Sequence, residues 1–272
     1  MIVDEDDISI MIEFEDISHG DNWSGSDWSI TDEDELAKLV ARVALGQSRY
    51  ALKILQETGC QAYAPTDSAL DGAIKLLSPG KKDPYHRDGW VFQVISWIAA
   101  HLQNPESLKS SPHMIHAHKG FDGLHVCLDE SNEDVVSIII CEEKATEGPR
   151  GKITTQVWPE FSSLETGDRD NELVSEVTGL LAQSQHSDPE RAVHEIMWKQ
   201  KRAYRLSITI GDDSNSEAGR QAVFKGYESI VLGSDVVRRR AETFHRKNLR
   251  VWMERFSSKT ILVAREMEAG NV

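Results

Sequence analysis

Two β-rich runs, residues 121–128 and 135–142, constrain the fold of this chain more than any other feature of its sequence. A short polar turn, residues 129–134, joins them, and this arrangement is typical of an antiparallel hairpin. The second run is apolar from Ile138 to Cys141, at positions that face both sides of a strand. A strand of this kind lies inside a sheet that is covered on both faces, so we expect residues 135–142 to be central.

Apolar residues recur at helical spacing on both sides of this hairpin. The helices that this spacing predicts cover about 34–57, 67–77, 89–102, 168–185, 189–202 and 235–256. Two further strands are expected at 204–210 and 260–264. Strands that alternate with helices after a hairpin predict an α/β fold, a mixed central β-sheet flanked by helices.

Negative charge is concentrated at the N-terminal end of the chain. There are 45 acidic and 30 basic residues, and 13 of the acidic ones lie within residues 1–35, which contain no Lys or Arg. We therefore expect residues 1–34 to be an acidic appendage, with an edge strand near residues 8–14, and residues 35–272 to be the main domain.

This acidic segment has two interpretations. It is either a solvated tail that favours solubility or a DNA mimic that occupies a basic surface. Its Trp23 and Trp28 are aromatic residues in a polar stretch, which is typical of a contact site.

Composition argues against several classes of protein. No apolar run approaches the roughly 18 residues of a membrane helix, and the first residues lack the basic flank of a signal peptide. We therefore expect a cytoplasmic protein without a membrane partner. The three cysteines form no C-x-x-C pair, so neither a disulfide framework nor a cysteine zinc site is expected.

Two carboxylates and a lysine are expected to converge on the hairpin. Side chains two apart in a strand share a face, so Glu142 and Lys144 project together and Glu143 points away. Pairing of the strands brings Asp122, at the start of the first strand, close to Glu142. A register shift of one residue would replace Glu142 by Glu143.

This residue set suits phosphodiester hydrolysis. Asp122 and Glu142 can hold Mg²⁺ or Mn²⁺, a hard cation that keeps several waters and can bridge a phosphate oxygen. Such an ion activates water and neutralises charge on the phosphoryl group. Lys144 would orient or deprotonate that water, or compensate the developing charge. The alternative is that Glu-x-Lys is only a solvated strand end.

The segment Gly120 to Gly123 (GFDG) and the segment Glu142 to Lys144 (EEK) resemble the restriction-endonuclease-like superfamily, the PD-(D/E)xK nucleases. The resemblance implies Asp122 and Glu142 as metal ligands and Lys144 as the catalytic lysine of a DNA nuclease. Members often add a carboxylate from the preceding helix, where this chain has Gln93.

A narrower resemblance is to the nuclease subunit of Hachiman anti-phage defence systems. It rests on a helix, the pattern G-x-D-G-x-H at residues 120–125, the Glu-x-Lys strand and a long C-terminal helix. This resemblance implies a helicase-like protein partner and DNA degradation on infection.

Basic residues near the C-terminal end are candidate nucleic-acid contacts. On the helix predicted at 235–256, Arg239, Arg246 and Arg250 are spaced by seven and four residues and nearly share a stripe, with Lys247 beside it. Such a stripe can follow a phosphate backbone without reading sequence. The alternative is a solvated helix face that pairs with nearby acids.

The remaining candidates are supporting residues. Gln93 and Glu143 lie close to the expected site, and His118 either lines the cleft or bonds locally beside the metal carboxylates. Alternatively, the histidines of this region could form a zinc site. Its ligands would come from the histidines at 113, 116, 118 and 125.

Two functions of different classes follow. The first is a metal-dependent DNA nuclease that acts in anti-phage defence with a helicase partner. The second is a catalytically weak or inactive subunit with a nuclease fold that binds and regulates a nucleic-acid motor or sensor protein. The acidic leader and the missing helix carboxylate favour the second.

Overall fold

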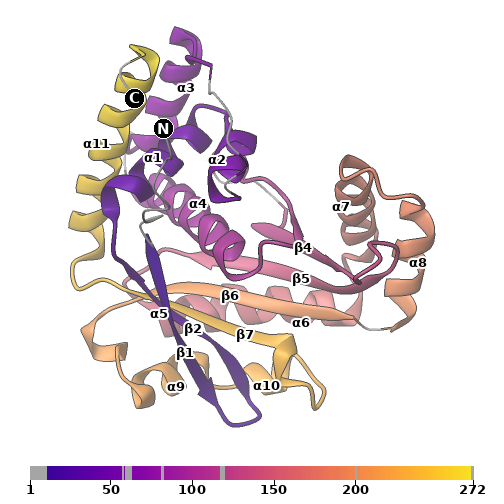
Figure 1. The fold of residues 1–272 in the computed structure, drawn as a ribbon. Helices are drawn as coiled ribbons and strands as arrows, with labels where there is room; N and C mark the ends of the chain where they lie inside the picture. The colour runs from indigo at the N-terminus through magenta and orange to yellow at the C-terminus, as the bar shows by residue number, and fades with distance from the viewer. Residues whose placement is uncertain are drawn as a thin grey trace, which may run out of the picture.

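The computed structural model describes residues 11–56, 58, 63–80, 83–116, 120–199 and 201–270. A seven-stranded sheet crosses the molecule in the order β1-β2-β7-β6-β5-β4-β3, with helices on both of its faces (Figure 1). Its strands are β1 (Ile12–His19), β2 (Trp23–Ile30), β3 (Leu108–Lys109), β4 (Gly123–Leu128), β5 (Val135–Lys144), β6 (Arg202–Ile210) and β7 (Arg239–His245). The predicted α/β architecture is confirmed.

The sheet is mixed. Four consecutive strands, β2, β7, β6 and β5, run parallel to one another, whereas β1, β4 and β3 pair antiparallel with their neighbours. The predicted hairpin is β4–β5, with Gly123 opposite Cys141 and Leu128 opposite Val135. Strand β5 lies between β4 and β6, which explains why its apolar run faces both sides.

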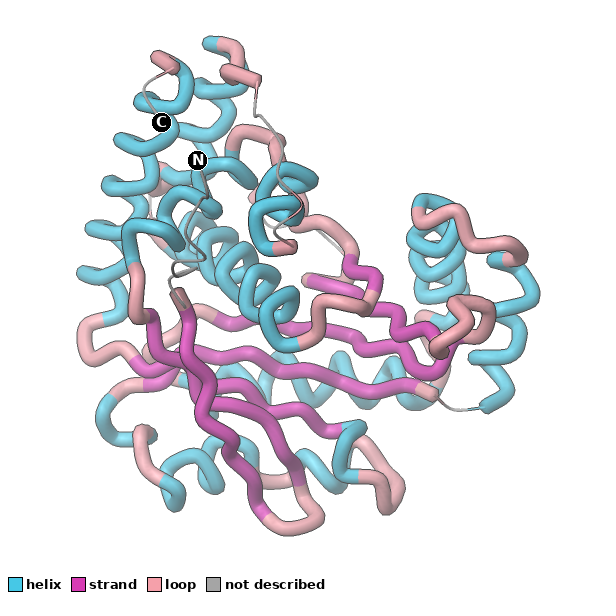
Figure 2. The backbone as a smooth tube through the Cα atoms, in the orientation of Figure 1, coloured by secondary structure: helices cyan, strands magenta, loops and turns pink. Residues whose placement is uncertain are grey.

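Helices cover the two faces of the sheet as separate layers (Figure 2). One layer contains α1 (Glu33–Ala44), α2 (Ser48–Leu55), α3 (Asp67–Leu77), α4 (Tyr85–Gln103) and α11 (Leu249–Glu268). The other contains α6 (Trp158–Thr166), α7 (Asp170–Gln183), α8 (Pro189–Lys199), α9 (Glu217–Phe224) and α10 (Tyr227–Ile230). A short helix α5 (Pro149–Lys152) and a π-helical turn (Ile153–Val157) lead from β5 into α6.

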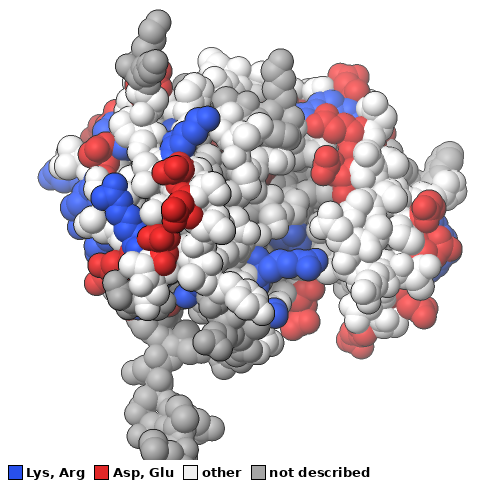
Figure 3. Space-filling view, turned by 90° about the horizontal axis from the view of Figure 1, so that it is seen from above, with Lys and Arg blue, Asp and Glu red and all other residues white. Residues whose placement is uncertain are grey.

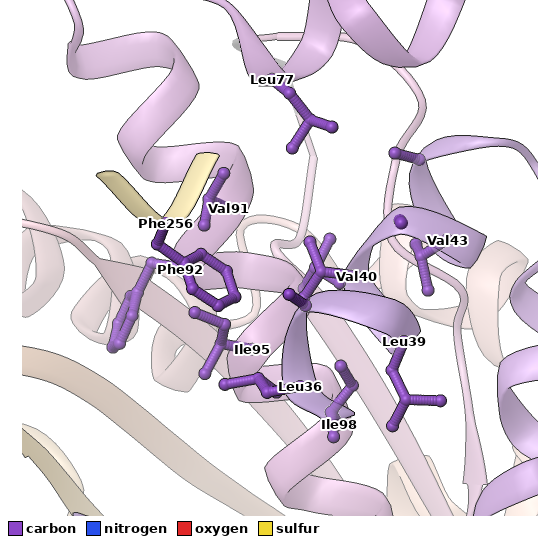
Figure 4. Close-up of a cluster of buried hydrophobic side chains, with 14 of the residues drawn as sticks. Leu36, Leu39, Val40, Val43, Leu77, Val91, Phe92, Ile95, Ile98 and Phe256 are labelled. Carbon is purple, nitrogen blue, oxygen red and sulfur yellow. The ribbon is translucent and has the colours of Figure 1, made fainter. Parts of the chain in front are cut away.

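Helix α4 lies in the centre of the first layer, between the sheet and α1. Val40 of α1 lies among Val91, Ile95 and Ile98 of α4 (Figure 4), and all four are fully buried. Burying an aliphatic side chain of this size contributes about 1.5–3 kcal/mol. The Asp32 carboxylate caps α1 by accepting hydrogen bonds from two of its first N–H groups.

The N-terminal strands correct one expectation. Residues 12–30 are not an appendage, because β2 is hydrogen bonded to β7 inside the common sheet. Trp23 and Trp28 are buried in the two core clusters, so they are not exposed contact residues. Residues 12–34 therefore do not form a detachable DNA mimic. Residues 1–10 lie outside the described part of the chain.

The C-terminal region corrects a second expectation. The predicted helix at 235–256 and strand at 260–264 are wrong: the chain forms β7 and then the single helix α11, with a short 3-10 turn before β7. Ala241 and Phe244, three residues apart, are buried on opposite faces of β7. Side chains that alternate between two faces are typical of a strand and not of a helix. Phe256, Thr260 and Ala264 are buried at helical spacing in α11.

The helices predicted at 67–77, 89–102, 168–185 and 189–202 agree with α3, α4, α7 and α8 to within four residues at each end. The helix expected at 34–57 is two helices, because Gly46 takes a left-handed conformation with φ of 78° between α1 and α2. No helix in the described ranges combines the length and apolar composition that crossing a membrane requires.

Candidate functional site

The three predicted catalytic side chains meet where β4 begins and β5 ends. Asp122 directly precedes β4, and Glu142 and Lys144 are among the last three residues of β5. The Lys144 ammonium lies 3.1 Å from Asp122 Oδ2 and 2.5 Å from Glu142 Oε2. Asp122 Oδ2 also accepts a hydrogen bond of 3.1 Å from the Glu143 amide, which ties the two strand ends together.

Burial and mutual charge set the protonation of this group. Glu142 is only 2% exposed, and burial, then the neighbouring Asp122, raise the pKa of its carboxyl well above the ordinary value. Burial alone would lower the pKa of Lys144, but the Glu142 and Asp122 carboxylates outweigh it and raise that pKa. Lys144 is therefore held as a cation, which makes it a charge-compensating group and a poor proton acceptor.

A cleft of about 700 Å³ opens beside this group. Asp122, Glu143 and Lys144 line it from the strand ends, and Gln93 lines it from α4. Glu143 lies on the opposite face of β5 from Glu142, as the strand period predicts. Helix α4 leaves the cleft open on that face, so Glu143 also lines the cleft.

Glu143 is held by buried polar partners. Ser96 Oγ on α4 donates a hydrogen bond of 3.1 Å to Glu143 Oε1, and the Arg205 guanidinium lies 3.9 Å from the same oxygen. Burial, followed by the charge of Asp122, raises the pKa of Glu143 to about 8. Its Oε2 is buried and has no hydrogen-bond partner among the described residues.

Arg205 extends these contacts across the sheet. It donates to Ser96 Oγ at 2.8 Å, and its Nε lies 3.8 Å from Glu242 Oε1 on β7. Trp28 Nε1 donates to the other Glu242 oxygen at 2.7 Å. We call Glu143, Ser96, Arg205 and Glu242 the buried polar chain. It is not predictable from the sequence, because Arg205 in an alternating strand is expected to face solvent.

The buried polar chain ends at a second cleft of about 530 Å³, beyond the last turn of α4. Arg205, Glu242 and Arg240 contribute to its walls. Figure 3 views the molecule from above and shows Lys and Arg side chains in a recess between two groups of helices. Helices α1–α4 and α11 lie on one side of the recess, and α7 and α8 lie on the other.

Gln93 supports the site through the main chain. Its side-chain amide donates a hydrogen bond of 2.5 Å to the carbonyl oxygen of Asp122. This contact fixes the loop before β4 against α4. Gln93 therefore positions Asp122 through the main chain.

The four predicted nucleic-acid contacts do not form a stripe. Arg239 is 2% exposed and donates to four main-chain carbonyls, so its role is structural and the predicted DNA contact is wrong. The Arg246 guanidinium stacks on Phe244, 4.2 Å from the ring centre. Lys247 is 75% exposed and lies 3.5 Å from Asp212.

Arg250 is the one of the four that lines the cleft. It is ion paired with the buried Asp88 of α4 and donates to Ala145 O at 3.3 Å. Its guanidinium lies over the ring of Tyr85, 4.6 Å from the ring centre. Arg250 therefore links α11, α4 and the loop after β5 at the cleft wall.

The histidines do not converge. His113 bonds to Phe121 O, His116 bonds to Leu76 O, and the buried His125 lies 3.4 Å from Cys141 Sγ. His118 lies outside the described residues. Within the described ranges there is no group of three or more His, Cys, Asp or Glu residues placed to hold a metal ion, so the zinc hypothesis gains no support.

A hard divalent ion nevertheless suits the carboxylates at the two strand ends, of which Asp122 and Glu143 line the cleft and Glu142 is buried without lining it. The Asp122 and Glu142 carboxylates already share one cation, the Lys144 ammonium. Mg²⁺ is commonly bound by one or two carboxylates together with waters and substrate phosphates. The unpartnered Glu143 oxygen is a further hard donor beside them. These residues fit Mg²⁺ or Mn²⁺.

No family model, no curated protein and no solved structure matches the chain. The functional assignment therefore depends on the geometry of the site.

Proposed function

We propose that this chain is a metal-dependent nuclease that hydrolyses DNA phosphodiester bonds. The observation that carries the proposal is the Lys144 ammonium between the Asp122 and Glu142 carboxylates at the edge of a cleft. The resemblance to PD-(D/E)xK nucleases supports it. A helicase-like partner and a role in anti-phage defence belong to the proposal through the resemblance alone.

Each residue has a distinct task in this proposal. Asp122 and Glu142 would hold Mg²⁺ or Mn²⁺, which supplies a Lewis acid for the phosphoryl oxygen and lowers the pKa of a bound water. Lys144 stays charged and stabilises negative charge that develops on the phosphoryl group. Gln93 keeps Asp122 in place through its carbonyl. Arg250 offers a guanidinium to a phosphate at the cleft wall.

The test is cleavage of labelled DNA by the purified full chain with Mg²⁺, Mn²⁺ or a chelator. We expect Glu142→Gln and Lys144→Ala to reduce the cleavage rate at least about 100-fold, because each removes a charge that acts on the reacting phosphate. The matched controls are Glu35→Gln and Lys38→Ala, which break an ion pair on α1 outside the cleft and should leave the cleavage rate unchanged. Full cleavage activity in both site variants would refute the proposal.

A second candidate is a nuclease-fold subunit without its own activity that regulates a nucleic-acid motor or sensor protein. Gln93 in place of a helix carboxylate favours it, because one metal donor fewer is then available. Calorimetric titration with Mn²⁺ separates the two candidates. Absence of metal uptake, together with no cleavage and a stable complex with a partner protein, would establish the second.

A further inference from the structure

The cationic groups around the cleft are few. The basic side chains that line it are Lys144, Lys152 and Arg250, against the carboxylates of Asp122, Glu143 and Glu147. Proteins that hold a duplex along its backbone typically neutralise about 6–10 phosphates. The cleft is therefore built for contact with a short stretch of backbone.

The rim of the cleft carries exposed apolar surface. Tyr85, the first residue of α4, is 61% exposed, and Ile115, in the loop before β4, is 59% exposed. Both line the cleft together with Asp122 and Lys144. Large apolar side chains exposed together beside a polar site are typical of a binding surface.

The ring of Tyr85 is held in place. Arg250 covers one face of it, and Arg250 is itself fixed by the buried Asp88 and by Ala145 O. The exposed part of the ring is thus a rigid aromatic surface next to the charged groups. A rigid aromatic surface loses little conformational entropy when a planar ligand stacks on it.

Base stacking decides which nucleic acid can use such a surface. In a duplex each base face is covered by its neighbours, so a protein ring can stack only on an unpaired or extruded base. Proteins that bind single strands combine a few backbone contacts with aromatic side chains on which bases stack. The rim and the small number of cations match that combination.

We propose that the cleft takes unpaired, single-stranded nucleic acid, with one base on Tyr85 and Ile115 and the adjoining phosphate directed toward Asp122 and Lys144. This inference rests on the proposed nuclease function and names its substrate. The cleft volume of about 700 Å³ is in the range of small-ligand pockets, which suits a few nucleotides.

The test is fluorescence anisotropy of the full chain with a short labelled single strand and with the duplex of the same sequence, in Ca²⁺ at fixed salt. We expect tighter binding of the single strand. Tyr85→Ala should weaken single-strand binding about 5- to 150-fold, the effect of losing one stacked base, and Tyr85→Phe should preserve it. The control is Tyr63→Ala, because Tyr63 is 84% exposed outside the cleft.

Three outcomes would overturn the inference: equal or tighter binding of the duplex, unchanged single-strand affinity in Tyr85→Ala, or equal weakening for both nucleic acids. If duplex is bound and cut, only the substrate inference fails. If neither nucleic acid is bound or cut, the proposed function fails with it. Equal thermal midpoints of wild type and Tyr85→Ala would show that the fold is intact.

Discussion

Lys144 is the residue on which the chemistry of the site depends. Its ammonium contacts both candidate metal ligands, so it stabilises them in the absence of an ion and competes with an ion for the same oxygens. This contact is predictable from the sequence because strand period and hairpin pairing are local rules. The place of Glu143 in the cleft is not predictable in this way, because it depends on where α4 begins on the sheet.

Removing this cation should separate metal binding from catalysis. We expect Lys144→Gln to bind Mn²⁺ more tightly than wild type, because the two carboxylates lose their internal counter-charge, and to cleave DNA at least about 100-fold more slowly. Glu142→Gln should lose both properties. Calorimetry gives the affinity and a cleavage assay the rate. Weaker Mn²⁺ binding in Lys144→Gln would contradict this role of the lysine.

Arg239 shows how a charged residue can be mistaken for a surface contact. We expect Arg239→Ala to lower the free energy of unfolding by about 3 kcal/mol, because it leaves the carbonyls of Asp21, Asn22, Val231 and Gly233 without their donor. The control Arg255→Ala breaks an exposed pair with Glu33 and should cost at most about 1 kcal/mol. Urea denaturation measures both, and unchanged stability with weaker DNA binding would restore the DNA-contact hypothesis.

At the scale of elements, local patterns were sufficient for the hairpin and for β6, and insufficient for β2 and β7. The hairpin is visible because its apolar run and its turn lie within one short segment. Strand β7 carries Arg239 and Glu242, and these buried charges are acceptable in a sheet because they have partners from distant segments. Strand β2 is rich in Gly and Ser, which do not favour a strand locally, and its place in the sheet comes from pairing with β7.

Gly25 tests whether β2 is integral to the sheet. A Cβ atom at this position would lie 1.9 Å from the carbonyl oxygen of Ala241 on β7. We expect Gly25→Ala to lower the free energy of unfolding by at least about 1–3 kcal/mol, because one of the two paired strands must shift.

The matched control is Gly72→Ala in α3. A Cβ at Gly72 meets no other atom within 4 Å, so the change should raise the free energy of unfolding by about 0.5–1 kcal/mol through helix propensity. Chemical denaturation gives both values. Equal stability of Gly25→Ala and wild type would mean that the β2–β7 pairing does not contribute to the folded state.

At the scale of the whole molecule, part of the acidic N-terminal segment belongs to the folded body and not to an appendage. Residues 12–34 carry part of the acidic segment into the fold, where β1 forms one edge of the sheet and Asp32 caps α1. Charge counts along a sequence cannot show this, because they carry no information on which strands pair. The interior instead holds polar groups from every part of the chain, including His101, His125 and Lys109.

These buried groups predict acid sensitivity. Burial, then the charge of Lys109, lowers the pKa of His101 to about 3, and burial also holds the pKa of His125 well below the usual value. Below pH ~6.5 these two histidines take up protons in the unfolded chain and not in the folded chain, so their contribution to stability is lost as the pH falls from ~6.5 toward 3.

The variant His101→Phe isolates this effect. It keeps a ring beside Trp97 and removes a titrating group, so its thermal midpoint should fall less steeply than that of wild type between pH ~6.5 and 4. Differential scanning calorimetry across that range gives the comparison. Parallel pH profiles of the two proteins would show that His101 does not contribute to acid unfolding.

The buried polar chain has a consequence for how this protein can vary among its relatives. One guanidinium, that of Arg205 on β6, lies between a carboxylate on β5 and another on β7. Losing the guanidinium alone would leave the buried Glu242 carboxylate without a counter-charge and would remove the cation beside Glu143, which is among the costliest changes a core can undergo. We therefore expect the three residues to be inherited together, so that descendants lacking Arg205 have also exchanged both glutamates.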